Sequence, residues 1–212
     1  MAEVQLPEFS AASTRDLLGF GLEHVVQRKR LVEIIARALD ACAGQPIRDR
    51  YLADVLAQSL EGAVVQLCSA AEWTQDLLRQ IRGGRLKDFR RAKKKDSLPP
   101  EVVNSFDTLF PNAVTRNSDR PNADDVLRLE EQLRICLAPL RVHRDKILAH
   151  WDANPPPPAT WGNLVEPFLV LEQLLGRLWH VHAREPYKVQ TLSPHTREST
   201  SEILAKAIQR QL

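Results

Sequence analysis

The sequence has little glycine and little tyrosine, with only 8 and 2 residues of these types among 212. Its apolar residues are mostly leucine, alanine, valine and isoleucine. Because leucine and alanine are strong helix formers and aromatic residues are enriched in strands, this composition favours helices. The chain is 43% hydrophobic and 26% charged, which is typical of a globular protein and not of a disordered one. Its length allows one large domain, or one domain with an appendage.

Long hydrophobic runs and paired cysteine motifs are also missing. No segment approaches the roughly 18 uninterrupted apolar residues of a membrane-spanning helix. Residues 1–7 include Glu3 and lack an apolar core, so we expect no secretory signal. The three cysteines, Cys42, Cys68 and Cys136, are odd in number and show no zinc-ligand spacing, and each lies in an apolar helical pattern. We therefore expect buried free thiols in a cytoplasmic protein that does not contact a membrane.

Apolar residues recur at every third or fourth position in four segments, as on the buried face of an amphipathic helix. The predicted helices run from Ser13 or Thr14 to Ala43, from Ile47 to Ile81, from Asn122 to the four prolines at 155–158, and from Thr160 to Ala183. Four such helices bury their apolar faces most simply as an antiparallel four-helix bundle. The predicted fold class is therefore all-α.

The remaining segments complete the predicted organisation around a bundle domain at residues 13–183. Within this domain, residues 82–121 form a long basic and irregular central loop that contains proline and asparagine. An irregular stretch of this length is uncommon in a compact domain. Outside the domain are a flexible leader at 1–12 and a linker with a short C-terminal amphipathic helix at 184–212.

The third predicted helix ends in the string R-V-H-R-D-K-I-L-A-H-W-D, residues 141–152. On a helical wheel, Arg144 lies in the same sector as Leu140 and Ile147, so a guanidinium interrupts the apolar stripe. Burying an unpaired charge is costly, and Arg144 therefore needs a partner or a cleft. A structural ion pair, or extension of the charge to the surface, would meet that need equally. Pro139 should kink or restart the helix just before this string.

His150 follows near the end of the same helix, where the backbone carbonyl dipole favours a protonated imidazole. Such an imidazole can act as a general acid or base near neutral pH. His143 shares its flank of the helix, and Asp145 projects from the opposite flank. A histidine in this position can also serve as a cap or a packing residue, so both interpretations stay open.

The string from His143 to Asp152 resembles the signature of the HEPN family, in which an arginine is followed by a polar residue and, a few positions later, by a histidine. It resembles more specifically the AbiU-type branch linked to abortive phage infection, where an R-D-K-x-x-A-H-x-D string is typical. The resemblance covers residues 15–183, although the central loop and Pro139 are not part of the family pattern. The matching residues are Arg144, Asp145, Lys146, Ala149, His150 and Asp152.

This resemblance implies a four-helix bundle that forms a homodimer and brings two Arg/His motifs into one composite cleft. It implies a metal-independent RNA endonuclease without a cofactor, with a role in phage defence or as a toxin. A cognate antitoxin or a defence-system protein is then a further partner. In this mechanism the ribose 2′-OH attacks the adjacent phosphate, Arg144 stabilises the developing charge, His150 transfers protons and Asp145 orients one of them. The supporting residues are His143, Lys146 and Asp152.

A basic segment lies between Arg79 and Asp96, with nine basic and two acidic residues in a chain of net charge +2. Closely spaced cations can follow an RNA backbone by releasing its counterions, although a solvated basic loop has the same composition. The candidate RNA contacts are Arg79, Arg82, Arg85, Lys87, Arg90, Arg91, Lys93, Lys94 and Lys95.

Two functional hypotheses follow from the sequence. The first is an endoribonuclease of the HEPN type, and the second is a catalytically silent HEPN-like module that binds a protein or RNA through the same cleft. Retention of both Arg144 and His150 favours the enzyme. His180 and His182 are two positions apart and face different directions on a helix, so we expect no metal site there.

Overall fold

The fold was analysed in a computed structural model, which describes residues 14–41, 50–91, 98–149, 159–188 and 194–209. Within these ranges the chain forms seven helices and no strand, which confirms the predicted all-α class. The helices are α1 (Thr14–Ala41), α2 (Arg50–Arg82), α3 (Pro100–Leu109), α4 (Pro111–Thr115), α5 (Ala123–Ala149), α6 (Trp161–Ala183) and α7 (Pro194–Gln209).

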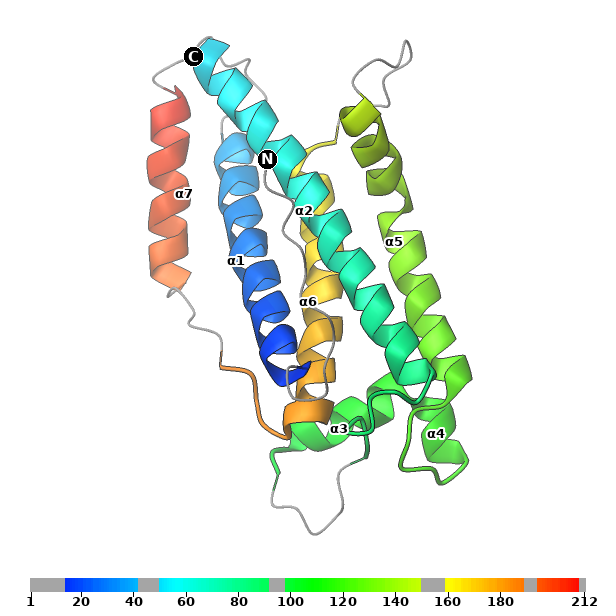
Figure 1. Ribbon diagram of the computed structural model, residues 1–212. Coiled ribbons are helices and arrows are strands. Elements are labelled where there is room, and N and C mark those ends of the chain that lie inside the picture. The colour runs from blue at the N-terminus through cyan, green and yellow to red at the C-terminus, as the bar shows by residue number, and fades with distance from the viewer. Residues whose placement is uncertain (1–13, 42–49, 92–97, 150–158, 189–193, 210–212) are drawn as a thin grey trace.

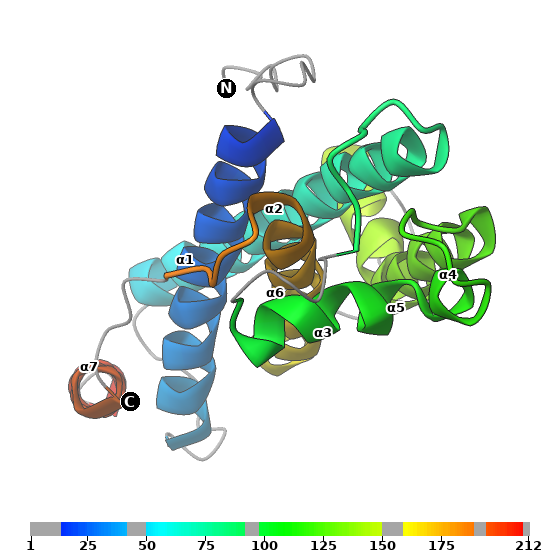
Figure 2. The same ribbon diagram turned by 90° about the horizontal axis from the view of Figure 1, so that it is seen from below.

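The four long helices α1, α2, α5 and α6 enclose the core, and each runs opposite in direction to the next along the chain (Figure 1). Helix α6 packs along α1, and it also contacts α2, α3 and α5. Helix α2 packs mainly along α5, whereas α1 and α2 are inclined to each other (Figure 2). The core between these helices includes Leu78 of α2, Leu133 of α5 and Phe168 of α6, all fully buried. The four predicted helical segments are thus confirmed over the residues that the structure describes, whereas residues 42–43, 47–49 and 150–154 lie outside them.

Capping residues begin α5 and α6 where the sequence predicts. The Asn122 side-chain oxygen accepts a hydrogen bond from the backbone N–H of Asp124 at 2.9 Å. The Thr160 hydroxyl oxygen accepts one from the backbone N–H of Asn163 at 3.3 Å. Both contacts satisfy N–H groups that have no partner within the helix. Helix α5 continues through Pro139, so the helix does not restart at this proline.

Two glycines in α1 allow two tryptophans to lie against its backbone. A Cβ atom at Gly21 would lie 2.8 Å from Cζ3 of Trp73 in α2, and one at Gly19 would lie 3.1 Å from Cζ3 of Trp179 in α6. Both rings are buried. Because Cβ atoms do not approach other heavy atoms to 2.8 Å, Gly21 is needed for the close approach of α1 and α2.

We expect the Gly21→Ala substitution to destabilise the protein by about 1–2 kcal/mol, because the Trp73 ring must move out of a packed core. Gly62 in α2 is a matched control, since a Cβ atom there meets nothing within 4 Å. The Gly62→Ala substitution should stabilise by about 0.5–1 kcal/mol through helix propensity alone. Chemical denaturation of both variants measures the difference. Equal effects at the two positions would contradict this packing.

The prediction of a long irregular loop at 82–121 is wrong for residues 100–115, which are helical except at Phe110. Helices α3 and α4 lie within that stretch, and α3 crosses the end of α6 (Figure 2). Pro100 and Pro111 occupy the first turns of these helices, where a missing N–H costs nothing. Phe106 in α3 and Phe110 just after it are both buried, and the backbone N–H of Phe110 donates to the carbonyl oxygen of Phe106 at 2.8 Å. The sequence predicts an irregular loop here because prolines inside a segment indicate helix breaks.

Helix α4 is joined to α5 by the carboxylate of Asp125, which is completely buried. This carboxylate accepts hydrogen bonds from the backbone N–H of Asn112 at 3.2 Å and of Ala113 at 3.1 Å. It also accepts one from the side-chain amide of Asn112 at 2.9 Å. Asp125 also lies in the first turn of α5, where a negative charge interacts favourably with the helix dipole. Its hydrogen bonds show that it also fixes the first turn of α4.

The C-terminal helix α7 begins at Pro194, within the segment 184–212 where the sequence predicts a linker and a short helix. It packs on α1 through Ala205 and Ile208, which contact Ala38. The sequence predicts a linker between α6 and α7. Tyr187, near the start of this linker, contacts α1. The Tyr187 hydroxyl donates a hydrogen bond to the Glu23 carboxylate at 2.7 Å. None of the helices in the described ranges has the length and apolar character needed to cross a membrane.

Candidate functional site

The last turns of α5 carry the candidate catalytic motif. His143, Arg144 and Asp145 lie there side by side in the sequence. Lys146 is part of the same helix, but its side chain is outside the described part of the structure. His150 and Asp152 also lie outside the described residues. The geometry of the site is therefore that of Arg144 and its neighbours.

Arg144 faces α2, and its side chain is only 18% exposed. Its Nη1 atom donates a hydrogen bond to Oε1 of Glu72 in α2. Its Nε and Nη2 atoms lie 2.9 Å and 2.8 Å from Oδ1 of Asp145. The expectation that Arg144 lies on the buried side of the helix and has a partner is confirmed.

These contacts determine the charge and the direction of the guanidinium. The hydrogen bond to Glu72 raises the pKa of Arg144 above its ordinary value, so the group stays charged. Two carboxylates hold the planar fork in one orientation, which is the arrangement that favours recognition of an oxyanion. The contacts use three of its five N–H donors. The Glu72 and Asp145 side chains are 47% and 64% exposed, so the ion pairs themselves lie at the surface.

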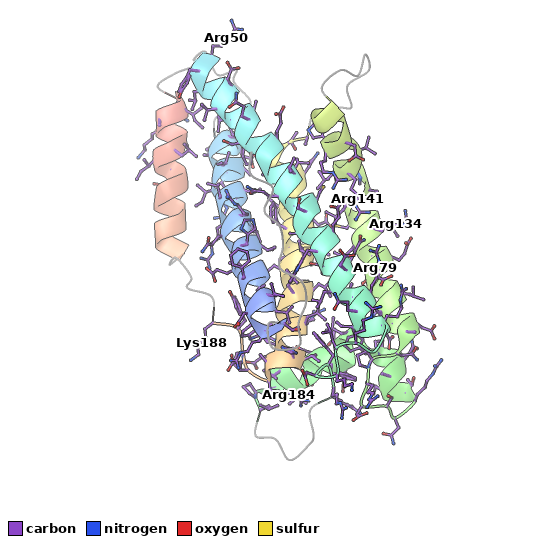
Figure 3. The ribbon with its side chains drawn as sticks, in the orientation of Figure 1. Arg50, Arg79, Arg134, Arg141, Arg184 and Lys188 are labelled. Carbon is purple, nitrogen blue, oxygen red and sulfur yellow. The ribbon has the colours of Figure 1, made fainter. Side chains whose placement is uncertain are left out.

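Arg144 belongs to a polar row along the contact between α2 and α5. Arg141 donates a hydrogen bond through Nη2 to Oε1 of Gln75 at 2.8 Å, one helical turn from Arg144 (Figure 3). Residue numbers increase along α2 as they decrease along α5, as in an antiparallel helix pair. The Nε atom of Arg141 is buried and has no hydrogen-bond partner among the described residues. Two guanidinium groups therefore lie together at this interface.

Glu72 is the residue that the sequence interpretation missed. It lies four positions after Cys68, which is fully buried, and three positions before Gln75. This spacing places the three residues on one face of α2. A polar row beside an apolar stripe was the signal available in the sequence. The partner on α5 could not be chosen without knowing which helices are adjacent.

The thiol of Cys68 is buried beneath the Arg144 and Glu72 pair. Burial raises its pKa to about 11, although the nearby charge of Arg144 acts in the opposite direction. The thiol is therefore protonated near neutral pH and is a packing group, not a nucleophile. The expected buried free thiol is confirmed for Cys68, whereas Cys136 is half-buried and Cys42 is outside the described residues.

His143 presents a second polar group near the motif. Its Nδ1 atom is buried and makes no hydrogen bond to any described residue. An unsatisfied ring nitrogen of this kind needs a partner such as water or a ligand. His143 therefore remains a supporting residue whose partner the described part of the chain does not supply.

The basic segment separates into two groups of side chains. Arg79 pairs with Asp76 at 2.7 Å, Arg82 with Glu130 at 3.1 Å and Arg91 with Asp107 at 2.8 Å. These three cations of the candidate RNA-contact set are thus partly neutralised by acidic neighbours. Arg85 and Lys87 are exposed, Arg90 is half-buried, and Lys93, Lys94 and Lys95 lie outside the described residues.

His180 and His182 point to different surroundings, as predicted. The Nδ1 atom of His180 lies 2.9 Å from the hydroxyl oxygen of Ser105 in α3. The ring of His182 stacks on Phe89, with 5.2 Å between the ring centroids. No group of three or more potential metal-ligating side chains occurs among the residues that the structure describes.

Comparisons of the chain with protein-family models, curated proteins and solved structures find no match.

Proposed function

We propose that the chain is a HEPN-type endoribonuclease that cleaves RNA without a metal ion. In this proposal α1, α2, α5 and α6 form the family's antiparallel four-helix bundle, and the motif at the end of α5 is the active site. The observation that carries the proposal is the position of Arg144. A charged, oriented guanidinium lies on the core side of α5 at the α2 interface, held by Glu72 and Asp145.

The residue types suit cleavage of a phosphodiester by its own 2′-OH. Arg144 offers N–H donors to the phosphate oxygens, on which negative charge develops in the transition state. Asp145 orients Arg144 through the contacts to Nε and Nη2. His150, which follows the last residue of α5, transfers protons between the attacking and leaving oxygens. The three residues thus divide the electrostatic, positioning and proton-transfer roles.

The complete site needs more than one copy of the chain. We propose a cytoplasmic homodimer in which two Arg144 and His150 pairs share one cleft, as the family resemblance implies. RNA is the substrate, and the exposed Arg85 and Lys87 remain candidate RNA contacts. A role in phage defence, or as a toxin with a cognate antitoxin, is part of the same proposal.

A second candidate function has its own supporting observation. Arg144 already forms ion pairs with two carboxylates, which is the structural role that a catalytically silent module would retain. Such a module would bind RNA or a partner protein without cleaving it. The two candidates differ in whether a phosphate can replace Glu72 as a partner of Arg144.

Incubation of the purified full-length protein with mixed RNA in EDTA tests the proposal. We expect the RNA to be cleaved, and we expect the His150→Ala variant to be slower by about 10²- to 10⁴-fold because general acid–base catalysis is lost. A Lys206→Ala variant is the control, since Lys206 is exposed on α7. RNA that is bound but left intact would favour the silent module. Cleavage that appears only with a divalent metal would contradict the mechanism.

A further inference from the structure

A pocket of about 520 Å³ lies away from Arg144, between the start of α1, the loop after α2 and the end of α6. Figure 3 shows Arg184 at the end of the molecule where α3 lies, whereas Arg141 is farther along α5. The pocket is lined by Arg15, Lys87, Asp88, Arg90, His182, Ala183 and Arg184.

The lining of this pocket is strongly cationic. It contains four basic side chains and one acidic side chain. The charge of Arg15 is offset by Glu185 at 2.5 Å, so much of the positive potential comes from Lys87 and Arg90. Cations that converge on one concave surface attract an anion more strongly than the same charges spread over a surface. The lining therefore favours a ligand with more than one negative charge.

Hydrogen bonds hold the arginines of the pocket in place. Arg90 donates through Nε to the carbonyl oxygen of Lys87 at 3.0 Å. Arg184 donates through Nη2 to the carbonyl oxygen of Arg90 at 3.1 Å. Arg15 lies over the ring of Trp179, with 5.6 Å from Cζ to the ring centroid. A ligand would therefore meet cations whose side-chain entropy is already partly lost, which lowers the cost of binding.

His182 adds a polar group that lacks a partner. Its Nδ1 atom is buried and makes no hydrogen bond within the described part of the chain. Its ring stacks on Phe89, which fixes the ring plane. Burial lowers the pKa of His182, so the neutral imidazole can donate or accept according to its tautomer.

We propose that this pocket binds a small molecule through a doubly charged phosphate group. Arginine side chains match phosphate oxygens in geometry as well as charge, and ligand pockets commonly enclose about 300–1,000 Å³. The phosphate group can belong to inorganic phosphate or to an organic phosphate monoester. The pocket includes neither Arg144 nor His150, although Lys87 and Arg90 also belong to the candidate RNA contacts.

Calorimetric titration of the full-length protein with inorganic phosphate, and separately with ribose 5-phosphate, tests the proposal. Sodium chloride at matched ionic strength corrects for non-specific screening. We expect saturable binding that the Lys87→Gln and Arg90→Gln variants each weaken by about tenfold or more, because a charge-assisted hydrogen bond is lost. Tighter binding of ribose 5-phosphate would show that the pocket recognises a monoester, and equal binding would show that it recognises the phosphate group alone.

Controls separate this pocket from other basic surfaces. Arg37 is exposed on α1 and Lys206 is exposed on α7, and neither lines the pocket. The Arg37→Gln and Lys206→Gln variants should bind both probes like the unmodified protein. Equal weakening in the control variants, or no saturable binding of either probe, would overturn the proposal. It would also be overturned if only single-stranded RNA bound through Lys87 and Arg90, since that result indicates contact with an extended backbone.

Discussion

Replacement of Arg144 by alanine is expected to slow RNA cleavage in EDTA by about 10²- to 10³-fold. Removal of one preorganised donor to a developing oxyanion has an effect of this size. The Glu72 and Asp145 contacts keep the guanidinium charged and oriented. A neighbouring side chain that lacks these contacts cannot substitute for it. Initial cleavage rates on one defined RNA, compared between the two proteins, measure the effect.

The Arg144→Lys variant separates charge from geometry. Lysine keeps the positive charge but lacks the planar fork, so we expect a rate between those of the arginine and alanine proteins. The stability cost of the Arg144→Ala substitution should be only about 1 kcal/mol, because its carboxylate partners are largely exposed and can be solvated. Thermal unfolding therefore shows whether the alanine variant is still folded under assay conditions. Undiminished cleavage by a folded alanine variant would remove Arg144 from the mechanism.

Replacement of Asp125 by alanine is expected to have the largest effect on stability, about 2–4 kcal/mol. The substitution removes an acceptor of three hydrogen bonds and leaves the Ala113 backbone N–H with the carbonyl oxygen of Phe110 as its remaining partner. It also removes a favourable charge at the N-terminus of α5. Denaturant unfolding at neutral pH measures the loss.

Asp124 is the matched control for this prediction. It lies in the same first turn of α5, but its side chain is 63% exposed, and it pairs with Arg116 at 3.4 Å. The Asp124→Ala variant therefore loses a similar interaction with the helix dipole and only a weak surface ion pair. We expect it to lose less than about 1 kcal/mol. A similar loss in both variants would show that the hydrogen bonds to α4 contribute little.

The four long helices could be predicted from the sequence because their apolar periodicity and their end signals agree. Asn122 and Thr160 lie at the starts of their helices as predicted and cap them, and the spacing of Arg144 correctly indicates a half-buried, partnered position. These inferences depend only on residues a few positions apart. Local physical chemistry was sufficient for them.

Features that depend on contacts between distant segments could not be predicted in the same way. Pro100 and Pro111 break a helix in its interior but are tolerated in a first turn, so their meaning depends on where the helix begins. Glu72 lies 72 positions before Arg144, and their contact requires the α2 and α5 pairing. The phosphate-binding pocket likewise joins Arg15, Lys87 and Arg184, which come from three separate parts of the chain.

Analysis of the RNA ends produced in EDTA tests the central claim most directly. Attack by the 2′-OH predicts products with 2′,3′-cyclic phosphate and 5′-hydroxyl ends, and no cleavage at a site where that 2′-OH is replaced by hydrogen. The same products should be nearly absent with the Arg144→Ala and His150→Ala variants. Intact RNA, or cleavage that leaves 3′-hydroxyl and 5′-phosphate ends, would contradict the proposed mechanism.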